Sequence, residues 1–360
     1  MPESPALSAA VPVLYPPPRP HGEPGQPRSH DWGPVLAWLE GGRGFLLTTH
    51  VNPDADGLGS LAALALTLRR RGRRVDVLLP SAMPEVCRFL FEGFDGELRE
   101  GPAALAGADL EGLDRAVVLD VSGRARIGAV AELIERRALP VLILDHHLAS
   151  ETDGALAAVF PGLSSTGEVL GGLLGAWGEA PAPAEAQALY AALSSDTGGF
   201  NFSSTTGDTL ELAAALVRAG ARPERVHAQL EQNYPAARYD LMARFLATRR
   251  AHAGGRLLDF ELTRAMLAQT GASRDDSEGF PNLGLAIRNC QMTVLLCELE
   301  EGQVKLNLRC VAPHDVCAIA RELGGGGHRY AAGATLRGEI AELRPRVLEL
   351  ALAQVEQGEG

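Results

Sequence analysis

Residues 49–57 read Thr-His-Val-Asn-Pro-Asp-Ala-Asp-Gly and bring one imidazole and two carboxylates close together in the chain, those of His50, Asp54 and Asp56. The apolar run before them, residues 45–49, is typical of a buried strand. Residues 60–71 are rich in alanine and leucine and lack glycine and proline, which predicts a helix. The three side chains therefore belong to a strand-to-helix turn. In an open α/β sheet, ligands bind at such turns, outside the carboxyl ends of the strands.

Composition limits the class of protein. The chain has 360 residues, of which 46% are hydrophobic, as expected for a globular protein of two domains. Its formal net charge of -12 argues against a general nucleic-acid coat protein, which would need a surplus of Lys and Arg. The five cysteines form no C-x-x-C pair, which predicts reduced thiols and a cytoplasmic location. No apolar run is long enough to span a membrane, so we expect no membrane association.

Beyond residue 32, short apolar runs alternate with helical segments, which is typical of a parallel sheet with crossover helices. These runs cover residues 44–49, 74–79, 115–120 and 140–145. His50 follows the first run, Asp120 ends the third, and residues 145–147, Asp-His-His, end the fourth. Because parallel strands end at the same edge of a sheet, we expect these side chains to meet. Asp196, in contrast, follows a predicted helix over residues 184–193.

Convergence of these residues would concentrate negative charge. Two unit charges about 4 Å apart repel by about 4 kcal/mol at an effective dielectric of about 20. Divalent cations would remove the repulsion, and oxygen and imidazole ligands without thiolate favour Mn²⁺, with Mg²⁺ or Co²⁺ as alternatives. Two such ions can clamp a phosphoryl group and generate a hydroxide nucleophile, which predicts phosphoester hydrolysis. The competing interpretation is structural: Asp54 or Asp56 would cap the following helix, and His146 or His147 would be an ordinary hydrogen-bonded histidine.

The same residues resemble the four motifs of the DHH phosphoesterase family, in order. The motifs are His50-x-x-x-Asp54-x-Asp56, Asp120, Asp145-His146-His147 and Asp196-Thr197-Gly198. The resemblance implies one ion held by His50, Asp54 and Asp120. It implies a second ion held by Asp56, Asp120, His146 and Asp196, with Asp120 as the bridge. His147 would face the scissile phosphate as a catalytic residue. Asp145 is expected to accept a hydrogen bond from a neighbouring histidine and so select its tautomer.

A second informative stretch, residues 323–333, reads Leu-Gly-Gly-Gly-Gly-His-Arg-Tyr-Ala-Ala-Gly. The glycine run predicts the end of a helix and backbone N–H groups that can surround an anion, with a flexible turn as the alternative. Residues 303–337 are locally basic, and Arg309 at the end of a predicted strand is the expected phosphate clamp. The segment resembles the DHHA1 substrate-binding domain. We therefore expect substrate contacts from Arg309, Gly325, Gly326, Gly327, His328 and Arg329.

Residues 276–279, Asp-Ser-Glu-Gly, resemble the nano-RNase and pAp phosphatase branch of this family, although Cys310 stands where that branch usually has serine. The resemblance implies a Mn²⁺-dependent enzyme that degrades oligoribonucleotides of about two to five residues exonucleolytically and dephosphorylates 3′-phosphoadenosine 5′-phosphate (pAp). Hydrolysis of cyclic di-AMP or of pApA is the enzymatic alternative. A non-catalytic nucleotide sensor is the alternative of another class, although all six ligand positions carry competent side chains.

The expected fold is a bilobal α/β protein with a central cleft. A disordered proline-rich tail (1–30) precedes a DHH metal-binding catalytic domain (31–230) with a parallel sheet flanked by helices. A helical connector (231–255), a smaller α/β DHHA1 substrate-binding domain (256–345) and a C-terminal helix end and tail (346–360) follow. The expected partners are short RNA oligonucleotides and pAp, with short DNA and a homodimer as further candidates.

Overall fold

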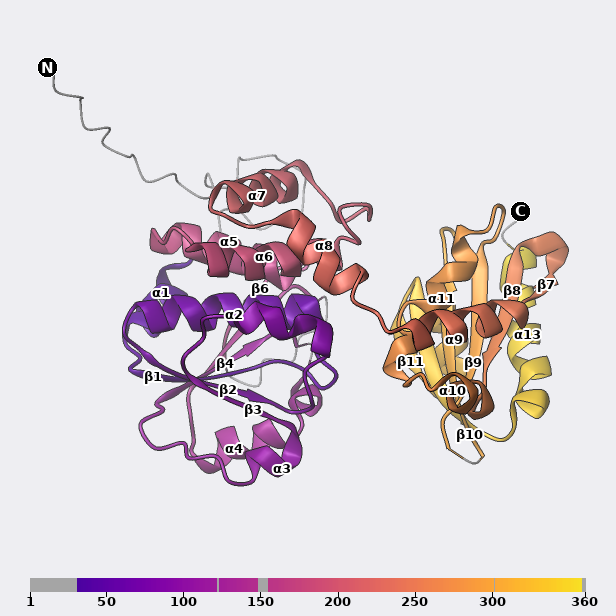
Figure 1. The fold of residues 1–360 in the computed structure, drawn as a ribbon, viewed down its shortest axis with the longest axis horizontal. Coiled ribbons are helices and arrows are strands. Elements are labelled where there is room, and N and C mark those ends of the chain that lie inside the picture. Colours follow the sequence, from indigo (N-terminus) through magenta and orange to yellow (C-terminus); the bar gives the residue numbers. More distant parts are fainter. Residues whose placement is uncertain (1–30, 122, 148–154, 301, 358–360) are drawn as a thin grey trace, which may run out of the picture. The chain divides into compact units, whose positions relative to one another are not determined.

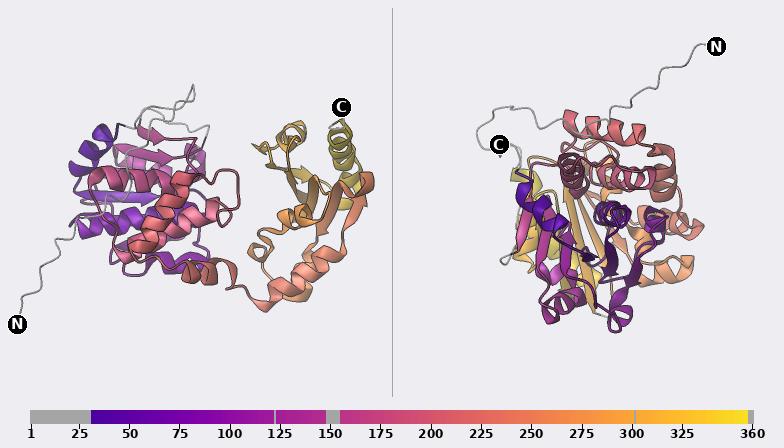
Figure 2. Two further views of the ribbon diagram at one scale, coloured as in Figure 1. Left: turned by 90° about the horizontal axis from the view of Figure 1, so that it is seen from above. Right: turned by 90° about the vertical axis from the view of Figure 1, so that its left-hand side faces the viewer.

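A computed structural model of the chain describes residues 31–121, 123–147, 155–300 and 302–357. The chain divides into two compact units, and the division falls between Asn233 and Tyr234. Each unit contains a six-stranded sheet with helices packed on it (Figures 1 and 2). The tail predicted over residues 1–30 lies outside the described residues. Among those described, no helix combines the length and the apolar character needed to cross a bilayer.

The N-terminal unit is built on a parallel sheet, as predicted. Its strands are β1 (Gly44–Thr48), β2 (Arg74–Leu79), β3 (Glu97–Glu100), β4 (Arg115–Leu119), β5 (Val141–Asp145) and β6 (Leu156–Val159). They are arranged in the order β3-β2-β1-β4-β5-β6, and every neighbouring pair is parallel. Strands β2 and β3 are added on one side of β1, and β4, β5 and β6 are then added on its other side. The crevice between β1 and β4 is therefore the topological switch point, where ligands bind in sheets of this kind.

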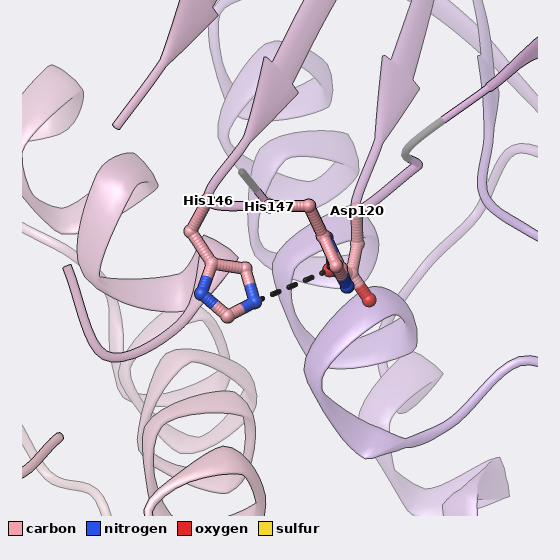
Figure 3. A group of neighbouring side chains, drawn as sticks. All are labelled: Asp120, His146 and His147. Atoms are coloured by element: carbon pink, nitrogen blue, oxygen red, sulfur yellow. Dashed lines mark ion pairs between the residues drawn. The ribbon is translucent and has the colours of Figure 1, made fainter. Parts of the chain in front are cut away.

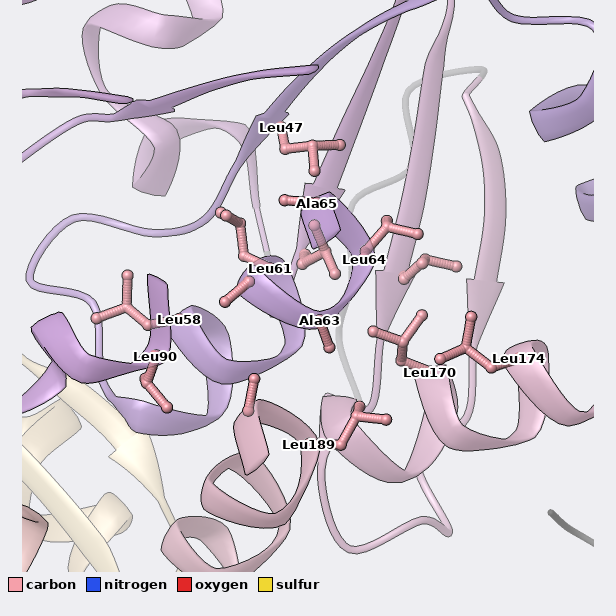
Figure 4. Packing of buried hydrophobic residues seen from close by; sticks show 14 of the residues in the cluster. Leu47, Leu58, Leu61, Ala63, Leu64, Ala65, Leu90, Leu170, Leu174 and Leu189 are labelled. Carbon is pink, nitrogen blue, oxygen red and sulfur yellow. The ribbon is translucent and has the colours of Figure 1, made fainter. Parts of the chain in front are cut away.

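Helices cover both faces of this sheet. They are α1 (Gly33–Glu40), α2 (Ala55–Arg70), α3 (Gly101–Leu105), α4 (Ala129–Arg136), α5 (Thr166–Trp177), α6 (Pro183–Asp196), α7 (Gly207–Arg218) and α8 (Pro223–Glu231), with short 3-10 helices η1 (Glu85–Phe91) and η2 (Arg124–Ile127). Successive side chains of a strand point to opposite faces. Accordingly, Leu47 joins the core under α2, α5 and α6 (Figure 4), whereas Leu46 joins the core under α3 and α4. Burial on both faces explains why these strands are continuous apolar runs.

Helix α2 begins within the turn of residues 49–57 and is itself part of the core. Thirteen of its residues are buried, because it lies between the sheet and α6. Gly59 permits this approach, since a Cβ there would lie 2.5 Å from the carbonyl oxygen of Ala188 in α6. As a result, the first turn of α2 and the last turn of α6 both reach the carboxyl-end edge of the sheet.

The C-terminal unit has a mixed sheet in the order β11-β12-β10-β9-β8-β7. The strands are β7 (Arg250–His252), β8 (Leu257–Leu262), β9 (Met292–Glu298), β10 (Gln303–Cys310), β11 (Gly326–His328) and β12 (Ala331–Arg337). Only the β8–β9 pair among these is parallel. The helices are α9 (Ala236–Ala247), α10 (Arg264–Thr270), α11 (Phe280–Leu283), α12 (Val316–Glu322) and α13 (Ile340–Gln357).

Two of these helices bear on the expected domain limits. Helix α9, in the segment expected to connect the domains, packs Leu241 and Phe245 into a core with Phe260 of β8. Helix α13 runs without interruption across residue 345 and packs Val347 and Ala351 against the other face of the sheet. Both helices are therefore structural parts of the C-terminal unit.

Candidate metal centre

Carboxylates and imidazoles gather at the carboxyl-end edge of the parallel sheet. They form three groups, in each of which one ligand atom per residue lies within 4.8 Å of the others. The groups are His50, Asp54 and Asp120; Asp56, His146 and Asp196; and Asp120, His146 and His147. Asp120 and His146 each belong to two groups, so the three groups form one continuous cluster. All six residues that the sequence predicts as metal ligands are in it.

The first group joins the end of β1 to the start of α2. Nε2 of His50 lies 3.4 Å from Oδ2 of Asp120 and 3.8 Å from Oδ2 of Asp54. The other oxygen of Asp54, Oδ1, accepts the backbone N–H groups of Asp56 and Gly57, both at 3.1 Å. Asp54 is therefore a helix cap through one oxygen and faces the cluster with the other. The capping interpretation and the ligand interpretation are compatible for this residue.

The side chain of Asp56 does not cap its own helix, α2, but accepts hydrogen bonds from the first turn of a different helix, α5. Its Oδ2 accepts the backbone N–H of Thr166 at 2.8 Å and its Oδ1 that of Gly167 at 2.9 Å, both from the first turn of α5. The side chain is almost fully buried, and its Oδ2 lies 3.7 Å from Nε2 of His146. The same Nε2 lies 3.2 Å from Oδ2 of Asp196. Asp196 is the last residue of α6, which extends three residues beyond the predicted end at 193.

Asp120 lies at the centre of the cluster, where its backbone turns sharply after β4. Its φ of 58° is in the left-handed region, which Asp tolerates better than most residues. Its Oδ1 lies 3.7 Å from Nε2 of His146 and 3.6 Å from Nδ1 of His147 (Figure 3), while Oδ2 faces His50. The two oxygens of one carboxylate thus serve different groups, as a bridging ligand requires.

His147 differs from the other histidines because Asp145 holds it. Asp145 is fully buried, and its Oδ1 lies 2.7 Å from Nδ1 of His147. The same oxygen accepts the backbone N–H groups of His146 and His147 at 2.8 and 3.2 Å. A carboxylate oxygen can only accept, so Nδ1 of His147 carries a proton and offers no lone pair to a metal. This hydrogen bond also raises the pKa of His147.

The electrostatics of the cluster fit bound cations. Burial and the nearby charges of Asp120, Asp196 and Asp54 raise the pKa of Asp56 well above its usual value. Burial likewise raises the pKa of Asp196 to about 6. Although burial opposes it, contact with Asp120 and Asp54 raises the pKa of His50 to about 10. Without cations the site therefore holds protons in their place, because so many acidic groups cannot all ionise side by side.

The buried hydroxyl of Thr49 and the lack of a side chain at Gly57 also favour a bound cation. Oγ1 of Thr49 is buried without a hydrogen-bond partner among the described residues. A Cβ built on Gly57 would lie 2.5 Å from that oxygen, 3.2 Å from Oδ2 of Asp120 and 3.5 Å from Nε2 of His50. The glycine thus keeps open a small space lined by three polar atoms. Oxygen and nitrogen donors around such a space suit Mn²⁺ or Mg²⁺.

Several residues of the site were not found from the sequence. They are Thr166 and Gly167, which bind Asp56, and Arg126, whose guanidinium lies 3.2 Å from Nδ1 of His50. The sequence did contain a signal for the first two: Ser165 and Glu168 have the Ser-x-x-Glu spacing of a helix start, and Ser165 Oγ does accept the N–H of Glu168. That signal locates a helix but cannot identify what its first turn binds.

In the C-terminal unit, Arg309 is a half-buried cation near the end of β10. Its Nε donates to Oδ1 of Asn282 at 3.2 Å and its Nη1 to the carbonyl of Leu308 at 3.0 Å. Within the described part of the chain it has no carboxylate partner. Burial lowers its pKa, so the guanidinium lacks the solvation or counter-charge that such a group normally has. Arg329 is exposed and donates to the carbonyls of Pro313 and His314.

The glycine run differs from the expected anion-surrounding turn. Gly324 ends α12 with a φ of 78°, and the N–H groups of Gly324 and Gly325 donate to the carbonyls of Arg321 and Ala320. The next three residues form strand β11, which pairs with β12. Gly325 is needed for close packing, because a Cβ there would lie 2.1 Å from the carbonyl oxygen of Gly333. Two of the four N–H groups are therefore already used within the helix end. The side chain of His328 lies outside the described atoms.

Family models and known proteins match this chain over most of its length. The model of the DHH family, N-terminal domain, matches residues 45–193, and that of the DHHA1 domain matches residues 262–357. The bifunctional oligoribonuclease and PAP phosphatase NrnA of Thermus thermophilus is 31% identical over 318 residues, which cover 88% of this chain and 90% of that protein. The chain belongs to the DHH family.

A second relative and a solved structure also match most of this chain. The bifunctional oligoribonuclease and PAP phosphatase NrnA of Bacillus subtilis is 24% identical, over 81% of this chain and 89% of that protein. The crystal structure of an exopolyphosphatase-related protein from Bacteroides fragilis superimposes with a TM-score of 0.81 at 24% identity. That comparison covers 90% of this chain and 94% of the other, and it supports the predicted fold.

Proposed function

We propose that this chain is a Mn²⁺-dependent phosphoester hydrolase that degrades oligoribonucleotides of a few residues from one end and removes phosphate from pAp. The observation that carries the proposal is the convergence of four carboxylates and the imidazoles of His50, His146 and His147 at the switch point of the sheet. Two relatives that match most of this chain are named for these two activities, and this is what favours them over cyclic di-AMP hydrolysis.

We assign His50, Asp54 and Asp120 to one ion, and Asp56, Asp120, His146 and Asp196 to a second. When bound, the cations would neutralise the carboxylates, polarise a phosphoryl oxygen and lower the pKa of a water. The protein contributes a pre-oriented ligand set, of which His50, Asp56 and Asp120 are buried. Asp54 and Asp56 are held by backbone N–H groups, so their orientation does not depend on the cations.

His147 is assigned to the scissile phosphate. Since its Nδ1 donates to Asp145, a second N–H exists on Nε2 only when the ring is protonated. The raised pKa favours that form near neutral pH. A protonated His147 can donate to a phosphate oxygen as negative charge develops, a contribution typically worth a 10²–10³-fold change in rate, or roughly 3–4 kcal/mol.

Arg309 is assigned to a terminal phosphate of the substrate, because it is a half-buried guanidinium of the C-terminal unit with no carboxylate partner among the described residues. Among the aromatic residues, Phe202 and Tyr330 are 57% and 45% exposed and are candidates for base stacking. Phe202 lies directly over Gly198, two residues from Asp196. Phe200, in contrast, packs against Tyr190 and is structural.

A substrate panel at one Mn²⁺ concentration tests the proposal. The panel contains pAp, di- to pentaribonucleotides, cyclic di-AMP and long single-stranded DNA. We expect pAp and the short ribonucleotides to be hydrolysed fastest, with all activity lost in chelator and in Asp120→Ala. Faster hydrolysis of cyclic di-AMP would support the alternative enzyme, and activity that persists in chelator would exclude the metal-dependent reaction.

A further inference from the structure

The first residue of α5, Thr166, contacts two carboxylates of the cluster at once. Its hydroxyl donates to Oδ1 of Asp120 at 3.0 Å, and its backbone N–H donates to Oδ2 of Asp56 at 2.8 Å. Thr166 is fully buried, so water cannot replace these bonds. Asp120 directly follows β4 and Asp56 lies in α2, so Thr166 links two segments that are distant in the sequence.

The neighbouring backbone contacts a third residue of the cluster. The carbonyl of Leu163 lies 3.3 Å from Nδ1 of His146. A carbonyl only accepts, so Nδ1 donates and the lone pair of the neutral ring is on Nε2, which faces Asp56 and Asp196. Residues 163–167 thus contact the side chains of three predicted metal ligands. We call this segment the α5 platform.

The α5 platform is itself anchored from behind. Oε2 of the buried Glu168 accepts the backbone N–H and the hydroxyl of Ser164, at 2.8 and 2.6 Å, and the hydroxyl of Thr209 in α7 at 3.2 Å. Gly167 brings the platform against α6, since a Cβ there would lie 2.7 Å from Cβ of Ala192. The position of Thr166 is therefore determined by packing and not by the cluster it serves.

We propose that Thr166 is a positioning residue of the metal centre, whose hydroxyl holds the Asp120 carboxylate with one oxygen toward His50 and the other toward His146. The terminal torsion of Asp is broad and roughly two-fold, so the carboxylate would otherwise rotate. Rotation would take an oxygen away from at least one ligand group. The inference rests on the proposed function, which supplies the metal ions. Its new element is that Thr166 orients the Asp120 carboxylate so that each of its oxygens faces one of the two ion sites.

Mn²⁺ binding to the full chain, measured by titration calorimetry and by the loss of the free-ion EPR signal, tests this proposal independently of activity. Residues that orient metal ligands typically contribute about 10–100-fold to metal affinity. We expect Thr166→Val to weaken at least one of two Mn²⁺ sites by that factor, and Thr166→Ser, which keeps the hydroxyl, to restore binding to within about threefold of the wild type. Thr166→Ala and Thr166→Ser form a second matched pair that avoids the bulk of valine.

Thr67→Val is the matched control. Thr67 is a fully buried threonine on α2 that donates to the carbonyl of Ala63 and lies about 16 Å along the helix from Asp56. We expect this variant to bind both ions as the wild type does. Wild-type affinity and stoichiometry in both Thr166→Val and Thr166→Ala would overturn the inference. If the wild type binds Mn²⁺ but hydrolyses no member of the substrate panel, the proposed function fails while the binding comparison still decides the role of Thr166.

Discussion

His50 and Asp120 follow neighbouring strands on the two sides of the switch point, and Nε2 of His50 lies 3.4 Å from Oδ2 of Asp120. After β1 the chain continues to β2 on one side of the sheet, and after β4 it continues to β5 on the other side. This divergence opens the crevice between β1 and β4. The pair therefore places the candidate metal centre at the switch point of the parallel sheet. The side chains from α2, β5 and α6 are added around this pair.

Replacing Asp120 is expected to abolish catalysis without unfolding the protein. Asp120→Asn keeps the shape of the side chain but removes the charge shared by both ligand groups. Since metal ions supply several kcal/mol of charge stabilisation in the transition state, we expect kcat/KM for pAp to fall about 10³-fold. The circular dichroism spectrum of the chelated variant should match that of the wild type, because Asn fills the same space and can still accept the hydrogen bond from Thr166. A variant that retains more than a tenth of the wild-type activity would contradict the bridging role.

Gly57→Ala separates metal binding from folding. Alanine is favoured over glycine inside a helix by about 1 kcal/mol, so the substitution raises the helix propensity of α2. The added Cβ, however, would lie 2.5 Å from Oγ1 of Thr49 and 3.2 Å from Oδ2 of Asp120. We expect Mn²⁺ affinity, measured by calorimetry, to drop at least tenfold while the circular dichroism spectrum is unchanged. Gly207→Ala, in the first turn of α7, where no atom lies within 4 Å of the new Cβ, is a control for binding.

In the metal-free protein, the contribution of Asp196 to stability should disappear as the pH rises. Burial raises the pKa of Asp196 from 3.8 to about 6, so the folded state binds more protons than the unfolded state between these values. A group of this kind stabilises the fold below its unfolded pKa, and the contribution disappears as the pH passes through the folded pKa. The raised pKa of His50, about 10, acts in the same direction at higher pH.

Thermal unfolding in chelator from pH 4 to pH 8 measures this effect. We expect the midpoint of the wild type to fall relative to that of Asp196→Asn between about pH 4 and pH 6, since carboxylates with lowered pKa, such as those of Glu100 and Glu261, act in the opposite direction in both proteins. Saturating Mn²⁺ should reduce this relative fall, because the ions replace the protons. A rise of the wild-type midpoint relative to that of the variant over this range would mean that the carboxylates of the cluster are compensated in some other way.

His147→Gln is expected to affect turnover more than metal binding. Nδ1 of His147 is occupied by Asp145 and is unsuited to bind a metal. We therefore expect kcat to fall about 10²–10³-fold, with Mn²⁺ affinity within about threefold of the wild type. In the wild type, kcat should decline at alkaline pH as His147 loses its proton, and this decline should be absent in the variant. Loss of Mn²⁺ binding in the variant would instead make His147 a ligand.

Arg309 provides a test of substrate binding in the C-terminal unit. A hydrogen bond to a charged group is worth about 1.5–3 kcal/mol, so Arg309→Ala should raise KM for pAp about 10–100-fold. Arg309→Lys should recover only part of this, because lysine lacks the bidentate fork. Arg321→Ala, on the exposed side of α12, is the control and should leave KM unchanged. Equal effects of Arg309→Ala and Arg321→Ala would point to general electrostatics and not to a phosphate clamp.

The sequence alone determined the parallel sheet and the positions of most residues of the cluster. Strands β1, β4 and β5 are continuous apolar runs because both faces are covered, and His50, Asp120 and residues 145–147 occupy their ends. Parallel strands necessarily bring such ends to one edge, so local patterns were sufficient. The short edge strands β3 and β6 lack that signal, because half-buried strands of four residues resemble loops.

The contacts that orient the ligands were decided only by the tertiary structure. Asp56 and Thr166 are 110 residues apart, and the spacing of neither residue indicates that the first turn of α5 binds the carboxylate of Asp56. The glycine run is ambiguous for a similar reason. Its residues permit a turn as well as a strand, and pairing with β12 selects the strand. Local sequence specifies which groups are present at the edge of the sheet, whereas the packing of distant helices decides which oxygen or nitrogen atom each group directs toward the site.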